Sequence, residues 1–105
     1  MTPPFLLSAT LVEMGSLAVQ LESDVVRARN LASVLAQELQ LDKTSSIRVG
    51  TAVSELCRNM LEYANGGIVH FSYGERSQQA GLAIAFTDKG PGITNLEAIR
   101  SGLLS

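Results

Sequence analysis

The sequence has no tryptophan and a single cysteine, and aromatic residues make up only 5% of it. One cysteine, Cys57, excludes an internal disulfide bond and a multi-cysteine zinc site, and it fits a reducing compartment such as the cytoplasm. So few aromatics leave no stacking platform for single-stranded nucleic acid. The formal net charge of −2 comes from interspersed charges, without the basic cluster that nucleic acid requires. The sequence therefore predicts a cytoplasmic protein that does not bind nucleic acid.

Long hydrophobic runs are also missing. The apolar opening stretch, residues 1–14, lacks a basic leader, is interrupted by Glu13 and is too short to span a bilayer. We predict no membrane association, and we interpret residues 1–16 as an N-terminal extension or a segment that contacts a partner. Residues 17–105 are predicted to form one domain, because 105 residues with 46% hydrophobic content suffice for a single core.

What is present is a clear order of helix and strand patterns. Apolar residues recur at helical spacing in two long segments, and Ser23 or Asp24 offers a cap for the first of them. Asn65-Gly66-Gly67 ends the second, since Asn and Gly accept the left-handed conformation that closes a helix. The order predicts an α+β two-layer sandwich, with helices on one face of a mixed, mainly antiparallel sheet. The predicted elements are a strand over 17–21, helices over 25–39 and 46–64, strands over 68–73 and 82–87, and a short helix over 95–100.

Two polar residues lie on one face of the second predicted helix. Glu55 and Asn59 are spaced i, i+4, so both can reach a single ligand from successive turns. An amide oxygen and a carboxylate are donors that suit Mg²⁺, and a carboxylate can accept a proton from an attacking hydroxyl. The alternative is that both are solvated residues on an exposed helix surface.

A second polar group follows the last predicted strand. Asp88 stands at the end of the apolar run 82–86 and is followed by Lys89-Gly90-Pro91-Gly92. An ionised carboxylate only accepts hydrogen bonds, so its natural partner is a donor such as an exocyclic amine. Gly90 and Gly92 permit a close approach of the backbone to a ligand, and Pro91 stiffens the turn. The alternative is an ordinary Gly/Pro turn that closes a strand.

Together these two segments resemble the motifs of a known superfamily. Residues 55–59, Glu-Leu-Cys-Arg-Asn, look like the N-box of GHKL ATPases, and residues 88–93 look like their G1 box. The sequence of residues 51–64 is most similar to that of the RsbT-like anti-sigma regulatory serine/threonine kinases. The resemblance runs from about Leu17 to the end of the chain, and two boxes in the right order are a specific signal.

The resemblance implies ATP and Mg²⁺ as cofactors and a role for each matching residue. Asn59 would hold the Mg²⁺ on the phosphates, and Asp88 would accept a hydrogen bond from adenine. Glu55 would be the catalytic base, or the group that orients the acceptor hydroxyl. Gly90 and Gly92 would let the backbone pass close to the nucleotide. Arg58 has two alternatives, a contact with phosphate or a pair with Glu55. The implied partner is a STAS-domain anti-anti-sigma-type protein, or a regulator of a sigma factor or phosphatase, in a stress-response switch.

The sequence also departs from this family, because residues 101–105 stand where relatives begin a lid and a Gly-rich G2 box. The fold is therefore expected to be incomplete at the C-terminus, with an exposed sheet edge that a second copy could cover as a homodimer. A kinase and a non-catalytic partner-binding module of the same fold both stay open. The ATP-binding part of a hybrid sensor histidine kinase is a third alternative, although the first helix has no histidine and His70 lies in a strand.

Overall fold

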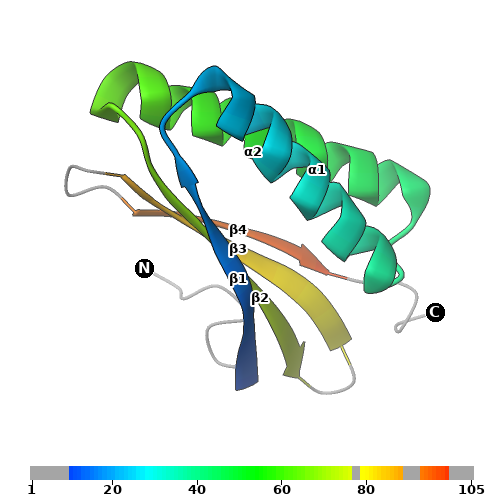
Figure 1. Cartoon of the computed structure of the whole chain (residues 1–105). Helices are drawn as coiled ribbons and strands as arrows, with labels where there is room; N and C mark the ends of the chain where they lie inside the picture. Colours follow the sequence, from blue (N-terminus) through cyan, green and yellow to red (C-terminus); the bar gives the residue numbers. More distant parts are fainter. Residues whose placement is uncertain (1–9, 77–78, 89–92, 100–105) are drawn as a thin grey trace.

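The computed structural model describes residues 10–76, 79–88 and 93–99. Within them, four strands form one sheet in the order β1-β2-β3-β4, and each neighbouring pair is antiparallel. Two helices lie side by side on one face of this sheet (Figure 1). The predicted α+β two-layer sandwich is confirmed, and the described sheet is antiparallel in place of mixed. The elements are β1 (Thr10–Val19), α1 (Glu22–Glu38), α2 (Lys43–Ala64), β2 (Gly67–Arg76), β3 (Gln79–Asp88) and β4 (Ile93–Ile99).

The prediction of a short helix over 95–100 is wrong. Residues 93–99 form strand β4, which pairs with β3 from Ile93 opposite Thr87 to Ile99 opposite Gly81. The local sequence contains good helix formers, but the far edge of β3 carries backbone groups that need partners. Satisfying these groups overrides the local propensity, a tertiary effect that periodicity cannot reveal.

The first strand is longer than predicted. It begins at Thr10 in place of Leu17, and its pairing with β2 shifts register between Glu13 and Gly15. Gly15 has φ +147°, and this bulge breaks the alternation by which a strand is recognised in the sequence. Residues 10–16 of the predicted extension are therefore part of the sheet. Residues 1–9 lie outside the described residues, and the division of the chain at residue 16 stays a prediction.

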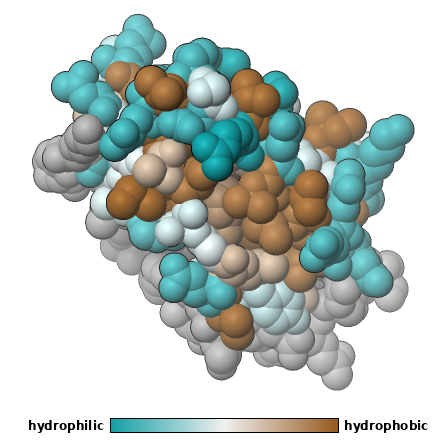
Figure 2. All heavy atoms as spheres, viewed as in Figure 1, coloured by the Kyte–Doolittle hydropathy of each residue, from teal (hydrophilic) through white to brown (hydrophobic). Residues whose placement is uncertain are grey.

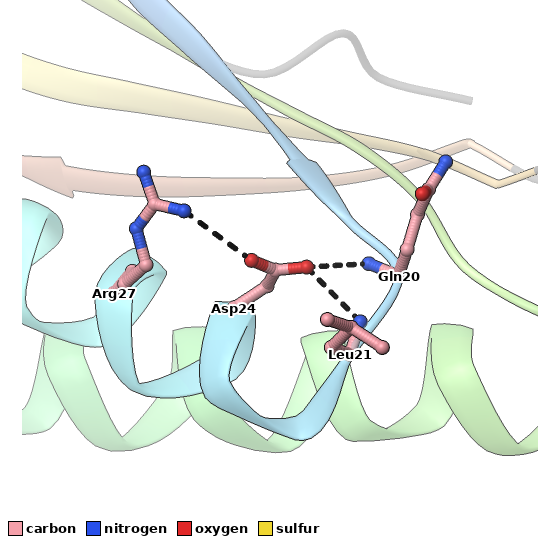
Figure 3. A network of polar contacts seen from close by, with 4 residues as sticks. All are labelled: Gln20, Leu21, Asp24 and Arg27. Atoms are coloured by element: carbon pink, nitrogen blue, oxygen red, sulfur yellow. Dashed lines mark hydrogen bonds and ion pairs between the residues drawn. The ribbon is translucent and has the colours of Figure 1, made fainter.

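Helix α1 begins on a carboxylate cap. The carboxylate of Asp24 accepts hydrogen bonds from the backbone N–H groups of Gln20 (2.9 Å) and Leu21 (3.0 Å). It also lies 3.5 Å from Nη1 of Arg27 (Figure 3). The cap prediction was right about the side chain but not about its position, since Asp24 caps from the third helical residue and the helix begins at Glu22. These backbone hydrogen bonds hold the pKa of Asp24 below its ordinary value of 3.8.

This cap predicts a pH-dependent contribution to stability. A carboxylate whose pKa is lowered by folding stabilises the fold above its ordinary pKa, and this contribution is lost as the pH falls through the lowered pKa. Asp24→Asn is therefore expected to lower the unfolding temperature at neutral pH, and the difference from wild type should shrink below pH 3.8. Thermal unfolding followed by circular dichroism measures this. Glu38→Gln, at the exposed far end of the same helix, is the control; a difference independent of pH would contradict the assignment.

Helix α2 is also closed at both ends by the residues that the sequence favours. The side chain of Asp42 accepts a hydrogen bond from the N–H of Ser45 at 2.6 Å. At the other end Asn65 is left-handed with φ 60°, and the N–H of Gly66 donates to the carbonyl of Met60 at 2.9 Å. The predicted stop is confirmed, because the helix ends at a left-handed Asn65 followed by Gly66.

The core lies between the two helices and the inner face of the sheet. Gly50 of α2 permits close contact with α1, because a Cβ there would lie 2.8 Å from Oγ of Ser33. Cys57 is fully buried, and burial raises the pKa of its thiol to about 11, so it acts as a small apolar side chain and is a poor nucleophile. The largest fully buried side chains are Phe71, Leu82, Ile84, Val19, Val25, Val53 and Val69.

Some large apolar side chains stay exposed. Figure 2, in the same view as Figure 1, shows hydrophobic residues gathered near the middle of this face with hydrophilic residues around most of them. Across the described residues the most exposed are Tyr63 (78%), Leu21 (64%) and Ile47 (58%). Among the described helices, none is both long enough and apolar enough to cross a membrane.

Candidate functional site

A cavity of about 220 Å³ lies where the C-terminal half of α2 meets the end of β3. Its polar lining residues are Asn59 of α2 and Asp88 of β3, both selected from the sequence. The fold therefore brings together two predicted site residues that lie in different elements. The complete lining is Leu56, Asn59, Met60, Tyr63, Ala64, Phe86 and Asp88.

Strand alternation accounts for the position of Asp88. Leu82, Ile84 and Phe86 point to the helices and are buried, and Asp88 is the next residue on that same face. The row of inward side chains thus ends in a carboxylate, at the point where the helical layer no longer covers the sheet completely. Asp88 is partly buried, and its backbone pairs with Gly67 at the start of β2.

Helix α2 supplies the opposite wall. Asn59 is exposed on one side of the helix, whereas Met60, the next residue, is buried towards the sheet and lines the floor of the cavity. Tyr63 lies one turn after Asn59 and is 78% exposed, so its ring stands at the rim. Neither Met60 nor Tyr63 was selected from the sequence as a site residue. Their positions, one and four residues after Asn59, are the sequence signal that could have placed them beside it on the helix.

Glu55 does not line the cavity. It is exposed and lies one helical turn before Asn59, so the two side chains share a face of α2. The Glu55 carboxylate therefore lies outside the cavity, on the same face of α2 as Asn59. A ligand that filled the cavity and extended past Asn59 would reach Glu55 with its outer end.

Arg58 makes a contact that the sequence did not predict. Its Nε donates a hydrogen bond to Oε1 of Glu22 at 3.2 Å, which joins α2 to the first residue of α1. The predicted alternative of a pair between Arg58 and Glu55 is therefore wrong, because Arg58 pairs with Glu22. Both side chains are more than half exposed, so this ion pair contributes little to stability. No local pattern could have paired residues 36 positions apart.

The cavity has a mixed lining, which fits a ligand that carries both apolar surface and a hydrogen-bond donor. Leu56, Met60 and Phe86 offer apolar walls, and an ionised Asp88 can only accept. In the described part of the chain, no three His, Cys, Asp or Glu side chains group as a metal site. A metal ion here would depend on Asn59 and on oxygens that the ligand itself brings. Gly90 and Gly92 lie outside the described residues, so their roles stay predictions.

Comparisons with known proteins address the family of the chain. Residues 17–104 match the family model described as a histidine kinase-like ATPase domain. The chain is 32% identical over 87 residues to the serine/threonine-protein kinase RsbT of Bacillus subtilis. That alignment covers 83% of this chain and 65% of the relative, so the chain spans less than two thirds of that protein. No solved structure matches the chain.

Proposed function

This chain belongs to the histidine kinase-like ATPase family, the GHKL ATPases, and from that premise we propose that it is the ATP-binding module of a protein serine/threonine kinase. The observation that carries the proposal is the joint lining of one cavity by Asn59 and Asp88. A local motif can arise by chance, but two motifs that converge on one cavity with apolar walls are much less common.

Each wall of the cavity has a role in this proposal. The carboxylate of Asp88 accepts a hydrogen bond from the 6-amino group of adenine, and the apolar walls hold the faces of the base. Asn59 supplies one oxygen ligand to Mg²⁺, which suits an ion that keeps several waters and phosphate oxygens in its shell. When bound, the ion neutralises charge on the phosphates during transfer.

Glu55 is proposed as the base that takes the proton of the acceptor hydroxyl. Its exposed position, beside Asn59 but outside the cavity, leaves it open to a protein substrate. The proposed acceptor is a serine or threonine of a STAS-domain partner in a cytoplasmic regulatory switch of the anti-sigma, stress-response type. The similarity to RsbT supports this partner class, and a homodimer through a sheet edge remains part of the proposal.

A non-catalytic role in binding a partner is the second candidate. It is favoured by apolar side chains that stay exposed on the helical layer away from the cavity, among them Val26 (41%), Val34 (49%) and Ile47 (58%). This candidate predicts partner binding that is independent of Glu55. The third alternative, the ATP-binding part of a hybrid sensor histidine kinase, stays open; the one histidine of the sequence, His70, is half-buried in β2.

Calorimetric titration of Mg²⁺-ADP into wild type and Asp88→Asn tests the proposal. Hydrogen bonds that involve a charged group contribute about 1.5–3 kcal/mol, so the variant should bind about 10- to 100-fold more weakly. It should also discriminate less against Mg²⁺-GDP, because guanine presents an acceptor where adenine has its amino group.

Glu62→Gln is the matched control, since Glu62 is an exposed carboxylate of α2 that does not line the cavity. It should bind Mg²⁺-ADP as wild type does. An Asp88→Asn protein that keeps both its affinity and its preference for adenine would overturn the assignment of the base site. A folded wild-type chain that binds no adenine nucleotide would overturn the proposed function itself.

A further inference from the structure

The turn between α2 and β2 joins the two walls of the cavity. Helix α2 supplies Met60 and ends at Ala64, and β2 begins three residues later at Gly67. Gly67 is the register partner of Asp88, so the first residue of β2 lies directly beside the proposed adenine contact. The short turn therefore places Gly67 between Met60, which lines the cavity, and Asp88.

No room for a side chain exists at Gly67. A Cβ built there would collide with the backbone carbonyl oxygen of Thr87. It would also lie 2.8 Å from Cα of Asp88 and 2.9 Å from Sδ of Met60, where ordinary contacts begin at 3.4 Å. Met60 is flexible and can move aside, but Thr87 and Asp88 are crowded through their backbone. A side chain at position 67 would therefore displace the backbone at the end of β3.

The conformation of Gly67 does not itself require glycine. Among the described residues the glycines with positive φ are Gly15 and Gly66, whereas Gly67 belongs to a regular strand. Gly66 is explained by the turn, because its φ is +107° and its Cβ would collide with the carbonyl of Val19. At Gly67, the first residue of β2, glycine is required for space, because the backbone of Thr87 and Asp88 approaches it closely.

We propose that Gly67 is a positioning residue of the nucleotide site, which sets the depth of the base pocket by letting the end of β3 close onto β2 and Met60. This inference rests on the proposed function. Asp88 can meet an exocyclic amine only if its Cα is held at a fixed distance from the apolar floor. The absence of a side chain at position 67 provides that distance, and any larger residue moves Asp88 relative to Met60.

The test compares Gly67→Ala with Gly50→Ala. Both glycines are crowded, but a Cβ at Gly50 meets the side chains of Ser33 and Arg29 between the helices, away from the cavity. Both variants should lose thermal stability. Gly67→Ala should in addition bind Mg²⁺-ADP about tenfold or more weakly and lose part of its preference over Mg²⁺-GDP, since displacements near 1 Å have large effects at such sites. Gly50→Ala should keep affinity and preference.

A double variant separates the two walls. If the displacement of Asp88 matters, adding Met60→Ala to Gly67→Ala leaves the loss of adenine preference in place, because the collision with β3 persists. Restored preference would show that only the packing of Met60 was disturbed, and it would overturn the inference. A Gly67→Ala protein that keeps the wild-type affinity and preference for adenine would also overturn the inference. The same holds for a Gly50→Ala protein that loses affinity and preference in proportion to its loss of thermal stability.

A measurement on the wild-type chain applies even if Gly67→Ala does not fold. In a titration with Mg²⁺-ADP followed by amide NMR, the resonance of Gly67 should shift together with that of Asp88, while that of Gly50 stays in place. A Gly67 resonance that moves no more than that of Gly50 would overturn the inference. Absence of any Mg²⁺-ADP binding by wild type would instead reject the proposed function, which distinguishes the two failures.

Discussion

Replacing Asn59 by alanine is expected to remove most of the effect of Mg²⁺ on nucleotide affinity and to slow phosphoryl transfer by about 10²–10⁴-fold. The physical reason is that a bound metal ion supplies several kcal/mol of charge stabilisation, and 1.36 kcal/mol corresponds to about tenfold in rate. Asn59 is the residue of α2 that contributes an amide oxygen to the lining of the cavity.

The measurement is Mg²⁺-ADP affinity at a series of metal concentrations, with transfer of the γ-phosphate to the partner protein as the second readout. Asn30→Ala is the matched control, because Asn30 is an exposed asparagine of the neighbouring helix and does not line the cavity. Asn59 is exposed, so the variant should keep its helical content. Unaltered metal dependence in a folded Asn59→Ala protein would reject Asn59 as the metal ligand.

Replacing Glu55 by glutamine is expected to separate binding from chemistry. Loss of a general base typically lowers the rate about 10²–10⁴-fold, so phosphoryl transfer should nearly disappear. Affinity for Mg²⁺-ADP should stay close to that of wild type, because Glu55 is exposed and does not line the cavity. The amide keeps the shape of the side chain, which limits the change to its charge and its ability to take a proton.

Single-turnover transfer of labelled γ-phosphate gives the rate, and calorimetry on the same preparation gives the affinity. Glu62→Gln again serves as the control, since it removes an exposed carboxylate from the same helix two turns away. Transfer at the wild-type rate by Glu55→Gln would exclude this residue as the base. Partner binding that persists without any transfer, in wild type as in the variant, would favour the non-catalytic module.

Most of the fold could be predicted from the sequence because its signals are local. The helical period of α1 and α2, the stop at Asn65-Gly66-Gly67 and the two apolar strands each depend on residues within a few positions of one another. The same holds for the chemistry of the site. Asn59 and Asp88 can be identified from residue type and from the motif around each of them.

The errors lie where distant segments decide the outcome. The predicted helix over 95–100 rested on the helix formers Leu96, Glu97 and Ala98, yet residues 93–99 form β4, because the edge of β3 needs hydrogen-bond partners. The start of β1 was missed because the bulge at Gly15 hides its alternation, and only pairing with β2 reveals the full strand. In both cases backbone hydrogen bonding to another strand outweighed the local sequence pattern.

Residue types and their spacing thus specified the layers, the ends of the helices and the two polar residues of the site. The convergence of Asn59 and Asp88 on one cavity, the ion pair between Arg58 and Glu22, and the crowding of Gly67 against Asp88 depended on the tertiary structure. The physical reason is that propensity and capping act over one or two turns, whereas a cavity exists only where separate elements pack and leave space between them.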